Sequence, residues 1–370
     1  MIGSLSIRNF KNLSGLTIPE LSRINLISGK NNVGKSSLLE ALSLYISDAQ
    51  LMSVMNGRGE SLKTSMRESA ANILKRNYDA LASLFTDRDN RVSEENVITI
   101  SDGSSFVSIR FVNYIIETYE SDGSIYRRET VIADNSQYQN DETFLALEIT
   151  RSDSSIVRLP LNRSFDRIRM LTDTIQHNFD NLITVNSNYD NTEFISTLWD
   201  AITLTDKEDY VIDALKIIEP GVESLAFLED TSALLRRQRY PVVKVNGIKG
   251  RVPLRSMGDG INHILAIALA LVNCENGCVM IDEIDNGLHY TVQKQLWSII
   301  FDLSKKLNVQ VFATTHSSDC ISSFSKILAS DGNDCDGKYI RLELRKGHVT
   351  TTEYNTDELA IVAAENIEIR

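Results

Sequence analysis

The last third of the chain alternates segments of helical periodicity with short, uninterrupted apolar runs. Helices are predicted over residues 259–273, 290–306 and 318–328, with strands over 277–282 and 309–314 between them. Uninterrupted apolar strands are typical of a parallel sheet that helices cover on both faces, because both sides of each strand are then buried. This part of the chain therefore predicts an α/β domain.

The beginning of the chain, over residues 1–46, follows the same pattern. Short β-like runs at residues 4–7 and 24–28 precede the segment Lys35–Ile46, whose leucines are spaced for one face of a helix. This segment is therefore expected to contribute strands and a helix to the same α/β domain.

The domain organisation follows from these two similar ends. We expect residues 1–50 and 240–370 to form one domain with a mostly parallel sheet flanked by helices, and residues 51–239 to be an insertion. Within the insertion we predict a helix over 61–85, an antiparallel β subdomain over 97–159 with turns at Asp102-Gly103 and Asp122-Gly123, and helical segments over 194–219.

Composition narrows the class of protein. The 370 residues are 42% hydrophobic and 24% charged, which is ordinary for a folded soluble protein. The longest apolar runs, such as Ile264–Val272, are too short to span a bilayer, and the N-terminus MIGSLSIRNFK lacks the features of a secretory signal. The four cysteines do not form two CxxC pairs and are typical of reduced thiols. We therefore expect a cytoplasmic protein without a membrane partner.

Charge is distributed unevenly along the chain. With 38 basic and 50 acidic residues the formal net charge is −12, so indiscriminate DNA binding is not favoured. The stretch Arg236–Arg255 nevertheless holds seven basic residues and no acidic one. It is either a solvated strand pair with basic residues on its wet edges, or a patch that contacts phosphate groups of nucleic acid or nucleotide.

A phosphate-binding motif gives the clearest chemistry. Residues Gly29–Ser36, GKNNVGKS, match G-x-x-x-x-G-K-[ST] between a predicted strand and a predicted helix, which is the context that this loop requires. The glycines let the backbone curl so that N–H groups face phosphate oxygens, and the helix N-terminus adds its dipole. Lys35 is the candidate for the β- and γ-phosphates, and the Ser36 hydroxyl is a candidate ligand of Mg²⁺. The predicted ATP-binding residues of this loop are Gly29, Asn31, Asn32, Gly34, Lys35, Ser36 and Ser37.

Two carboxylates end the next informative strand. In Cys278–Glu283, CVMIDE, apolar residues lead into Asp282 and Glu283 at the carboxyl end of a buried strand, where ligands bind in open α/β sheets. Asp282 is the candidate for holding Mg²⁺ through its water shell, and Glu283 is the candidate for polarising an attacking water.

A histidine follows the strand after the acidic pair. In Val309–Ser317, VQVFATTHS, the apolar run delivers His316 to the same predicted edge of the sheet. A histidine there can donate to a γ-phosphate or orient the lytic water, so His316 is the second predicted catalytic residue. A purely structural histidine is the alternative.

The order of these elements resembles that of ABC-type ATPases. In that family a Ser-Gly-Gly-Gln-like loop precedes the acidic strand and a switch histidine follows it. Here Ser256–Asp259, SMGD, occupies the first position, with Met257 in place of a glycine and Asp259 in place of the glutamine. The resemblance implies that Ser256 and Gly258 contact nucleotide held by another subunit, in a homodimer or higher homo-oligomer formed through the ATP sites.

Further segments resemble a narrower group. The sequence DNGLH at 285–289 and the blocks at 197–227 and 310–321 are similar to ABC-like ATPases related to the OLD (overcoming lysogenization defect) nucleases and their stand-alone ATP-binding relatives. OLD nucleases carry a C-terminal Toprim nuclease module, whereas the sequence after His316 runs only from Ser317 to Arg370, too short for such a module. The resemblance therefore implies a separate effector polypeptide, either a Toprim-like nuclease or a toxin.

The expected function combines these points. The resemblance implies a Mg²⁺-dependent ATPase that dimerises head to head around two ATP molecules. It would act as the sensor or motor of a nucleic-acid-related system for defence against phage or plasmid, with nucleic acid as a further candidate partner. A DNA-repair or recombination mediator, and a scaffold stabilised by ATP with little turnover, are the alternatives.

Three features are weaker candidates. Residues Arg8, Phe10 and Lys11 of the N-terminal hairpin either approach the nucleotide or form a plain edge strand and turn. The single DxD, Asp87–Asp89, is interpreted as a solvated turn. Gln50, Gln137 and Gln139 are candidates for the glutamine that links nucleotide to the insertion in ABC-type ATPases, by their order along the chain alone.

Overall fold

The computed structural model describes residues 1–47, 69–121, 124–132, 142–163, 182–186, 192–229, 239–330, 336–354 and 358–359. Six strands of this part of the chain form one sheet, in the order β16-β15-β3-β14-β13-β9. All neighbours in it are parallel except β15 and β16. The strands are β3 (Ile24–Gly29), β9 (Leu182–Val185), β13 (Cys278–Ile281), β14 (Gln310–Thr314), β15 (Gly337–Arg345) and β16 (His348–Tyr354).

Both faces of this parallel sheet are buried, and alternate residues enter two different cores. In β13, Val279 and Ile281 join one hydrophobic cluster, and Cys278 and Met280 join the other. The first cluster contains the apolar sides of α7 (Asp259–Asn273), α8 (Tyr290–Lys306) and α9 (Ser318–Ser330), and the second contains that of α1 (Lys35–Ile46). This two-sided burial explains why the central strands are apolar without interruption.

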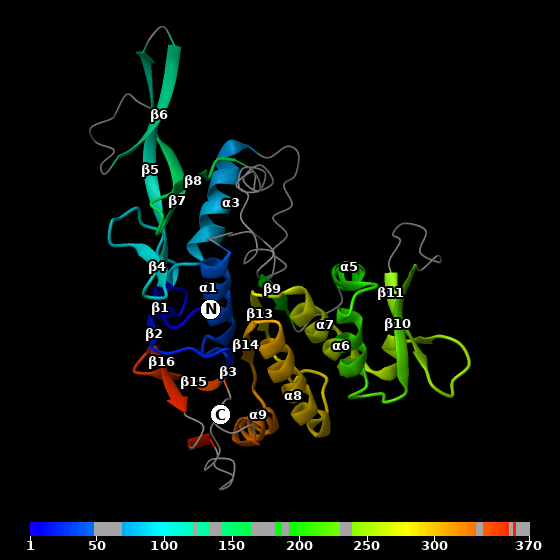
Figure 1. Cartoon of the computed structure of the whole chain (residues 1–370). Coiled ribbons are helices and arrows are strands. Elements are labelled where there is room, and N and C mark those ends of the chain that lie inside the picture. Colours follow the sequence, from blue (N-terminus) through cyan, green and yellow to red (C-terminus); the bar gives the residue numbers. More distant parts are fainter. Residues whose placement is uncertain are drawn as a thin grey trace.

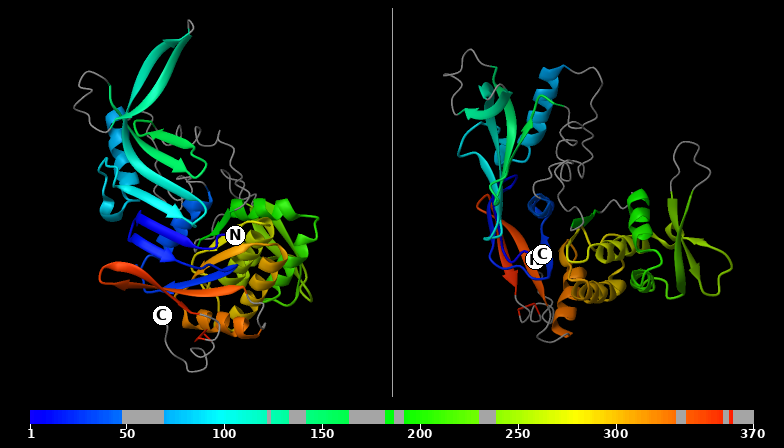
Figure 2. Two further views of the ribbon diagram at one scale, coloured as in Figure 1. Left: turned by 60° about the vertical axis from the view of Figure 1, so that its left-hand side comes forward. Right: turned by 45° about the horizontal axis from the view of Figure 1, so that its top comes forward.

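A second, antiparallel sheet lies on the far side of α1 (Figure 1). Among the described residues its strand order is β2-β1-β4-β5-β7-β8, with β6 paired to β5. The β5–β6 ribbon projects away from the body of the molecule in Figure 1 and in the left view of Figure 2. The elements are β1 (Leu5–Phe10), β2 (Leu13–Ile18), β4 (Val97–Ser101), β5 (Phe106–Ser121), β6 (Ser124–Ile132), β7 (Phe144–Arg151), β8 (Ile156–Pro160) and the covering helix α3 (Ala70–Ala82).

Strands from the two predicted segments mix in both sheets. β1 from the N-terminal segment pairs with β4 from the insertion, and β9 from the insertion pairs with β13. The N-terminal hairpin is thus the first part of the antiparallel sheet. Strand pairing thus joins the insertion to both terminal segments, and the boundaries at residues 50 and 240 stay predictions.

Helices α5 (Thr192–Ile202) and α6 (Lys207–Leu215) connect the main body to a small antiparallel sheet on the right of Figure 1. That sheet consists of β10 (Val222–Glu229), β11 (Arg239–Val245) and β12 (Val252–Pro253). This sheet, its β11–β12 connection and the turn after β12 contain the described part of the basic run, residues 239–255. There Arg239 forms an ion pair with Asp200, and Lys244 forms one with Glu223. Acidic residues from neighbouring elements therefore offset part of the positive charge that the sequence shows in isolation.

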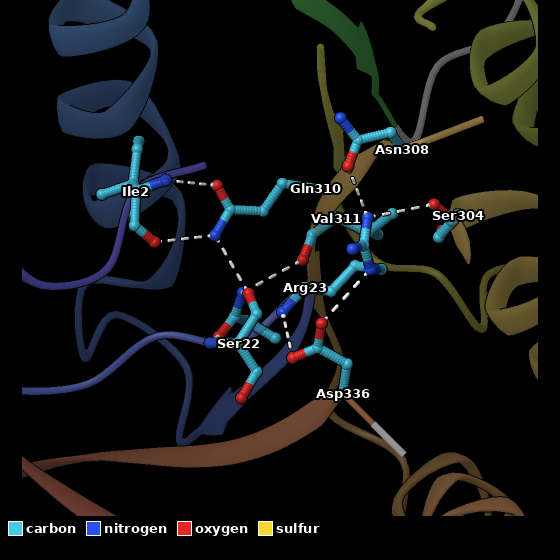
Figure 3. A network of polar contacts seen from close by, with 9 residues as sticks. Ile2, Ser22, Arg23, Ser304, Asn308, Gln310, Val311 and Asp336 are labelled. Atoms are coloured by element: carbon cyan, nitrogen blue, oxygen red, sulfur yellow. Dashed lines mark hydrogen bonds and ion pairs between the residues drawn. The ribbon is translucent and has the colours of Figure 1, made fainter. Parts of the chain in front are cut away.

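A polar network closes the end of the parallel sheet where its strands begin (Figure 3). The buried Gln310 side chain accepts from the Ile2 N–H (2.8 Å) and donates to the carbonyls of Ile2 (2.9 Å) and Ser22 (3.0 Å). Arg23 Nε donates to Asp336 (3.2 Å) just before β15. The Gln310 amide is paired at both its oxygen and its nitrogen, so its burial costs little in lost hydration. These hydrogen bonds connect β14 to the start of the chain and to the residues just before β3.

Most elements predicted from periodicity are confirmed. Helices α1, α7 and α8 have the predicted bounds, and strands β13 and β14 agree within one residue at each end. The predicted helix over 61–85 ends earlier, at Ala82, and the predicted helical region 194–219 contains the two helices α5 and α6. Residues 61–68 and the predicted turn Asp122-Gly123 lie outside the described part of the chain. In the described residues, no helix has the length and apolar character needed to cross a bilayer.

The hairpin β15–β16 is absent from the sequence prediction, although it adds a strand next to β3. Ile340 and Leu342 point into the core and alternate with Arg341 and Glu343, and the turn Lys346-Gly347 has positive φ at both residues (50° and 85°). Alternation of apolar and charged residues around such a two-residue turn is a hairpin signal.

Candidate active site

The predicted phosphate-binding loop Gly29–Ser36, called the P-loop below, depends on two glycines. Gly29 ends β3 with a φ of 148°, and a Cβ there would lie 2.6 Å from the carbonyl oxygen of Leu342 in β15. Gly34 has a φ of 117° at the start of α1, and its Cβ would lie 2.8 Å from the Asn12 side chain. The loop therefore packs too closely against β15 and the N-terminal hairpin for any side chain at these positions.

Lys35 is held at the centre of the loop. It is 6% exposed, and its Nζ donates to the carbonyls of Gly29 (2.9 Å) and Lys30 (3.2 Å) and lies 3.3 Å from His316 Nδ1. Burial lowers the pKa of Lys35 from its ordinary value, although nearby carboxylates act to raise it. The contact with His316 joins the P-loop directly to the end of β14.

The two carboxylates after β13 are positioned by β14. The Thr314 hydroxyl donates to Asp282 Oδ1 (2.6 Å) and accepts from the Glu283 N–H (2.9 Å). Glu283 has a positive φ of 55°, an uncommon backbone conformation for a residue with a side chain. One threonine hydroxyl thus fixes both predicted acidic residues.

Ser36 and Asp282 provide oxygens suited to Mg²⁺. The Ser36 hydroxyl donates to Asp282 Oδ2 at 3.4 Å, so the two groups lie side by side. Mg²⁺ is usually bound by one or two protein oxygens, with waters and phosphate oxygens completing its octahedron. The residues present therefore fit this cation.

One pocket of about 820 Å³ collects most of the predicted residues. It is lined by Asn31, Asn32, Gly34, Lys35, Ser36, Ser37, Asp282, Glu283 and His316. Its walls come from the loop between β3 and α1 and the start of α1, and from the residues that follow β13 and β14 in the last third of the chain. Gly29 does not line the pocket but shapes the loop from beneath.

Sequence patterns did not predict most of the residues on the other side of the pocket. Of the N-terminal hairpin candidates, Lys11 lines it and forms an ion pair with Glu40 of α1. Its remaining lining consists of Asn12, Ser83, Phe85, Asp87 and Arg88.

The N-terminal hairpin holds the turn after α3 against this pocket. The Lys11 N–H donates to the Leu84 carbonyl (2.9 Å), and Phe10 forms a bridge with Phe85. Asp87 and Arg88 are not buried, and both have positive φ (56° and 55°). The prediction of a solvated turn thus misses that this turn faces the P-loop, and only the tertiary pairing could have revealed it.

The third member of the DxD points to a local partner. Asp89 receives hydrogen bonds from the Arg91 side chain and backbone N–H, and these hold the pKa of its carboxyl at about 2. The three residues therefore do not act as one cluster.

Ser256 and Gly258 lie apart from this pocket. Both are exposed, and neither is among the residues that line it. Ser256 Oγ donates to the Pro253 carbonyl (2.7 Å), and Gly258 precedes α7 with a φ of 97°. The structure therefore leaves the loop Ser256–Gly258 facing solvent at a helix N-terminus. The glutamine candidates Gln50, Gln137 and Gln139 lie outside the described residues.

Comparison with known proteins identifies the family. Residues 24–321 match the family described as "AAA domain, putative AbiEii toxin, Type IV TA system". The chain belongs to this family. The match runs from β3, which precedes the P-loop, to the segment after His316, so it includes the whole P-loop and both Asp282 and Glu283.

Other proteins are similar to this AAA-domain protein over different lengths. An ATP/GTP phosphatase of Helicobacter pylori is 25% identical over 350 residues, which cover 89% of this chain and 88% of that one. An uncharacterised protein of Methanocaldococcus jannaschii is 49% identical over 47 residues, 13% of this chain and 22% of the other. A solved SMC head bound to the C-winged helix domain of ScpA aligns with a TM-score of 0.49 and 14% identity, covering 96% and 97% of the two chains. A Pyrococcus furiosus Smc head bound to the C-terminal domain of ScpA aligns with a TM-score of 0.48 and 12% identity over 99% of each chain.

Proposed function

We propose that the protein is a Mg²⁺-dependent ATPase. The observation that carries this proposal is the convergence of Lys35, Ser36, Asp282, Glu283 and His316 on one pocket. The name of the Helicobacter pylori relative, an ATP/GTP phosphatase, agrees with it.

Each side chain has a separate task in this proposal. Lys35 and the N–H groups of the P-loop bind the β- and γ-phosphates. Ser36 and Asp282 hold Mg²⁺, which when bound neutralises charge on the phosphate oxygens. Glu283 accepts the proton of the attacking water, and His316 stabilises the γ-phosphate from the neighbouring strand.

Replacing the general base tests this assignment. We expect Glu283→Gln to bind ATP with an affinity near that of the wild type and to hydrolyse it about 100-fold or more slowly, because an amide cannot accept the proton. Glu275→Gln is the matched control, since that exposed carboxylate pairs with Lys207 in a different part of the fold. Unchanged turnover in Glu283→Gln, measured as phosphate release, refutes the role of Glu283.

We further propose that two copies meet head to head around two ATP molecules. Ser256, the Gly258 N–H and the N-terminus of α7 form an exposed group suited to a γ-phosphate, and they do not line the pocket of their own subunit. Each nucleotide would then lie between the P-loop of one subunit and the loop Ser256–Gly258 of the other.

Complementation between two inactive variants tests this arrangement. Ser256→Arg is expected to bind ATP without hydrolysing it, and Lys35→Ala is expected to lose ATP binding. When the two are mixed, a heterodimer contains one intact composite site, so activity should return to about a quarter of the wild-type value. If mixing restores nothing, or if Ser256→Arg hydrolyses ATP normally, the shared site is refuted.

For the biological role we propose a sensor or motor subunit related to the OLD group, which acts with a separate effector in defence against phage or plasmid. The family description, which names a toxin and a toxin–antitoxin system, supports a role of this kind. Stimulation of turnover by duplex DNA at low salt tests the link to nucleic acid, for which the exposed basic residues Lys249, Arg251 and Arg255 are the candidates. A scaffold that uses ATP only for stability would show neither basal nor stimulated turnover.

A further inference from the structure

The N-terminus of α7 touches the segment that follows the acidic pair. A Cβ at Gly260 would lie 2.6 Å from the carbonyl oxygen of Gly287, which real structures do not show. The backbone of the first turn of α7 therefore packs directly against the Asn286–Gly287 backbone, with no room for a side chain between them. The side chain of Leu288, the next residue, is the second neighbour of Gly260 at 3.0 Å.

One helical turn later, His263 holds the neighbouring carbonyl. Its side chain is fully buried, and Nδ1 lies 2.9 Å from the Asn286 carbonyl oxygen. Because a carbonyl only accepts, Nδ1 carries the proton and donates it. Burial lowers the pKa of His263 to about 4, so the ring is neutral at pH 7 and this tautomer is retained.

The same segment is fastened to the hydrolytic residues at its other end. The Thr315 hydroxyl donates to Asp285 Oδ1 (2.5 Å), and the Ile284 N–H donates to the Thr314 carbonyl (2.9 Å). Within the segment, the Asn286 N–H donates to the Glu283 carbonyl (2.9 Å). Residues 283–288 are thus a compact turn between the end of β14 and the first two turns of α7.

The loop Ser256–Gly258 is fastened to α7. Gly258 is the residue before the helix, and the Asn262 side chain donates back to its carbonyl (3.3 Å). The hydrogen bond from His263 to the Asn286 carbonyl and the close backbone contact at Gly260 therefore connect the segment after Glu283 to the helix that follows this loop. Both contacts are internal to a single subunit, whereas the loop at their end faces outward.

We propose that His263 is a positioning residue that couples the acidic pair of one ATP site to the loop Ser256–Gly258, which completes the site of a second copy. The inference rests on the proposed shared site. In this proposal, the Asn286 carbonyl, His263 and Gly260 transmit changes at one nucleotide of the dimer to the site of the other nucleotide. His263 itself touches no nucleotide.

The experiment measures ATP-dependent dimerisation in the Glu283→Gln background, with cis binding of a fluorescent ATP analogue by the monomer as the second readout. His263→Leu removes the donor, whereas His263→Asn keeps an N–H near the position of Nδ1. For His263→Leu we expect a dimer dissociation constant about tenfold higher and cis affinity within about twofold of the parent. His263→Asn should recover most of the dimerisation.

A second variant does not depend on tolerance at the buried histidine. Gly260→Ala, which pushes against the Gly287 carbonyl, should weaken dimerisation in the same direction while ATP still binds in cis. If His263→Leu and Gly260→Ala dimerise like the parent, or if His263→Asn is as defective as His263→Leu, the coupling role is overturned. An equal loss of cis binding indicates a merely structural role and also overturns it. If the Glu283→Gln parent itself does not dimerise with ATP, the shared site fails, which is a distinguishable result.

Discussion

Thr314 offers the sharpest test of how the site is held together. Its side chain is fully buried at the end of β14, and its hydroxyl is the common partner of the Asp282 carboxylate and the Glu283 N–H. Thr314→Val keeps the β-branched shape and removes only this hydroxyl. The substitution therefore removes one hydrogen-bond partner from the Asp282 carboxylate and one from the half-buried Glu283 N–H.

The expected cost follows from the two lost hydrogen bonds. A bond to a charged group contributes about 1.5–3 kcal/mol and a neutral one about 1 kcal/mol, so the free energy of unfolding should fall by about 2–4 kcal/mol. Release of the acidic pair should also misplace Glu283, and a displacement near 1 Å lowers turnover by about 100-fold.

Two assays and one control separate these effects. Urea unfolding can be followed by the fluorescence of the buried Trp199 and Trp297, and turnover by phosphate release. Thr314→Ser retains the hydroxyl and should stay close to the wild type in turnover. If Thr314→Val matches the wild type in both stability and turnover, the hydroxyl does not position the acidic pair and the reasoning is wrong.

Two further predictions concern the parts of the molecule that sequence patterns did not reveal. Arg88→Ala should weaken ATP binding, measured by fluorescence titration, by about threefold to tenfold, because the positive charge of Arg88 lines the pocket proposed for the phosphates. Arg91→Ala is the control: it removes an exposed arginine that is paired with Asp89, and it should leave ATP binding unchanged in the same titration. The second prediction follows from His263, whose folded pKa of about 4 lies below the ordinary value of 6.5. Between these two values the unfolded chain binds more protons, so stability falls as pH falls. From pH 7 to pH 4.5 the wild type should lose about 2 kcal/mol more than His263→Asn, measured by urea unfolding, and equal losses would contradict the buried neutral imidazole.

The sequence predicted the half of the pocket that is built from local motifs. In the P-loop and in Cys278–Glu283, the predicted site residues are adjacent to the strand that positions them, so spacing and periodicity are sufficient to predict them. His316 follows the same logic, because the carboxyl ends of neighbouring parallel strands meet at one edge.

The opposite half is tertiary in origin. Ser83 and Arg88 reach the pocket because Phe10 of the N-terminal hairpin pairs with Phe85, which lies beyond α1 and α3 in the chain. No local pattern encodes that pairing. In the same way, the basic run Arg236–Arg255 carries an apparent excess of charge that Asp200 and Glu223, on other elements, partly remove.

The position of β3 in the parallel sheet also has a consequence for how the chain is made. Ile24 pairs with Val311 on one side and with Gly337 on the other, so both neighbours of the P-loop strand come from near the opposite end of the chain. At about 5–20 residues per second, a ribosome needs roughly 15–60 s to deliver them. During that interval an apolar strand has two unpaired edges, and closing so long a loop slows folding further. The motif that is easiest to find in the sequence is therefore among the last parts of the molecule to reach its working shape.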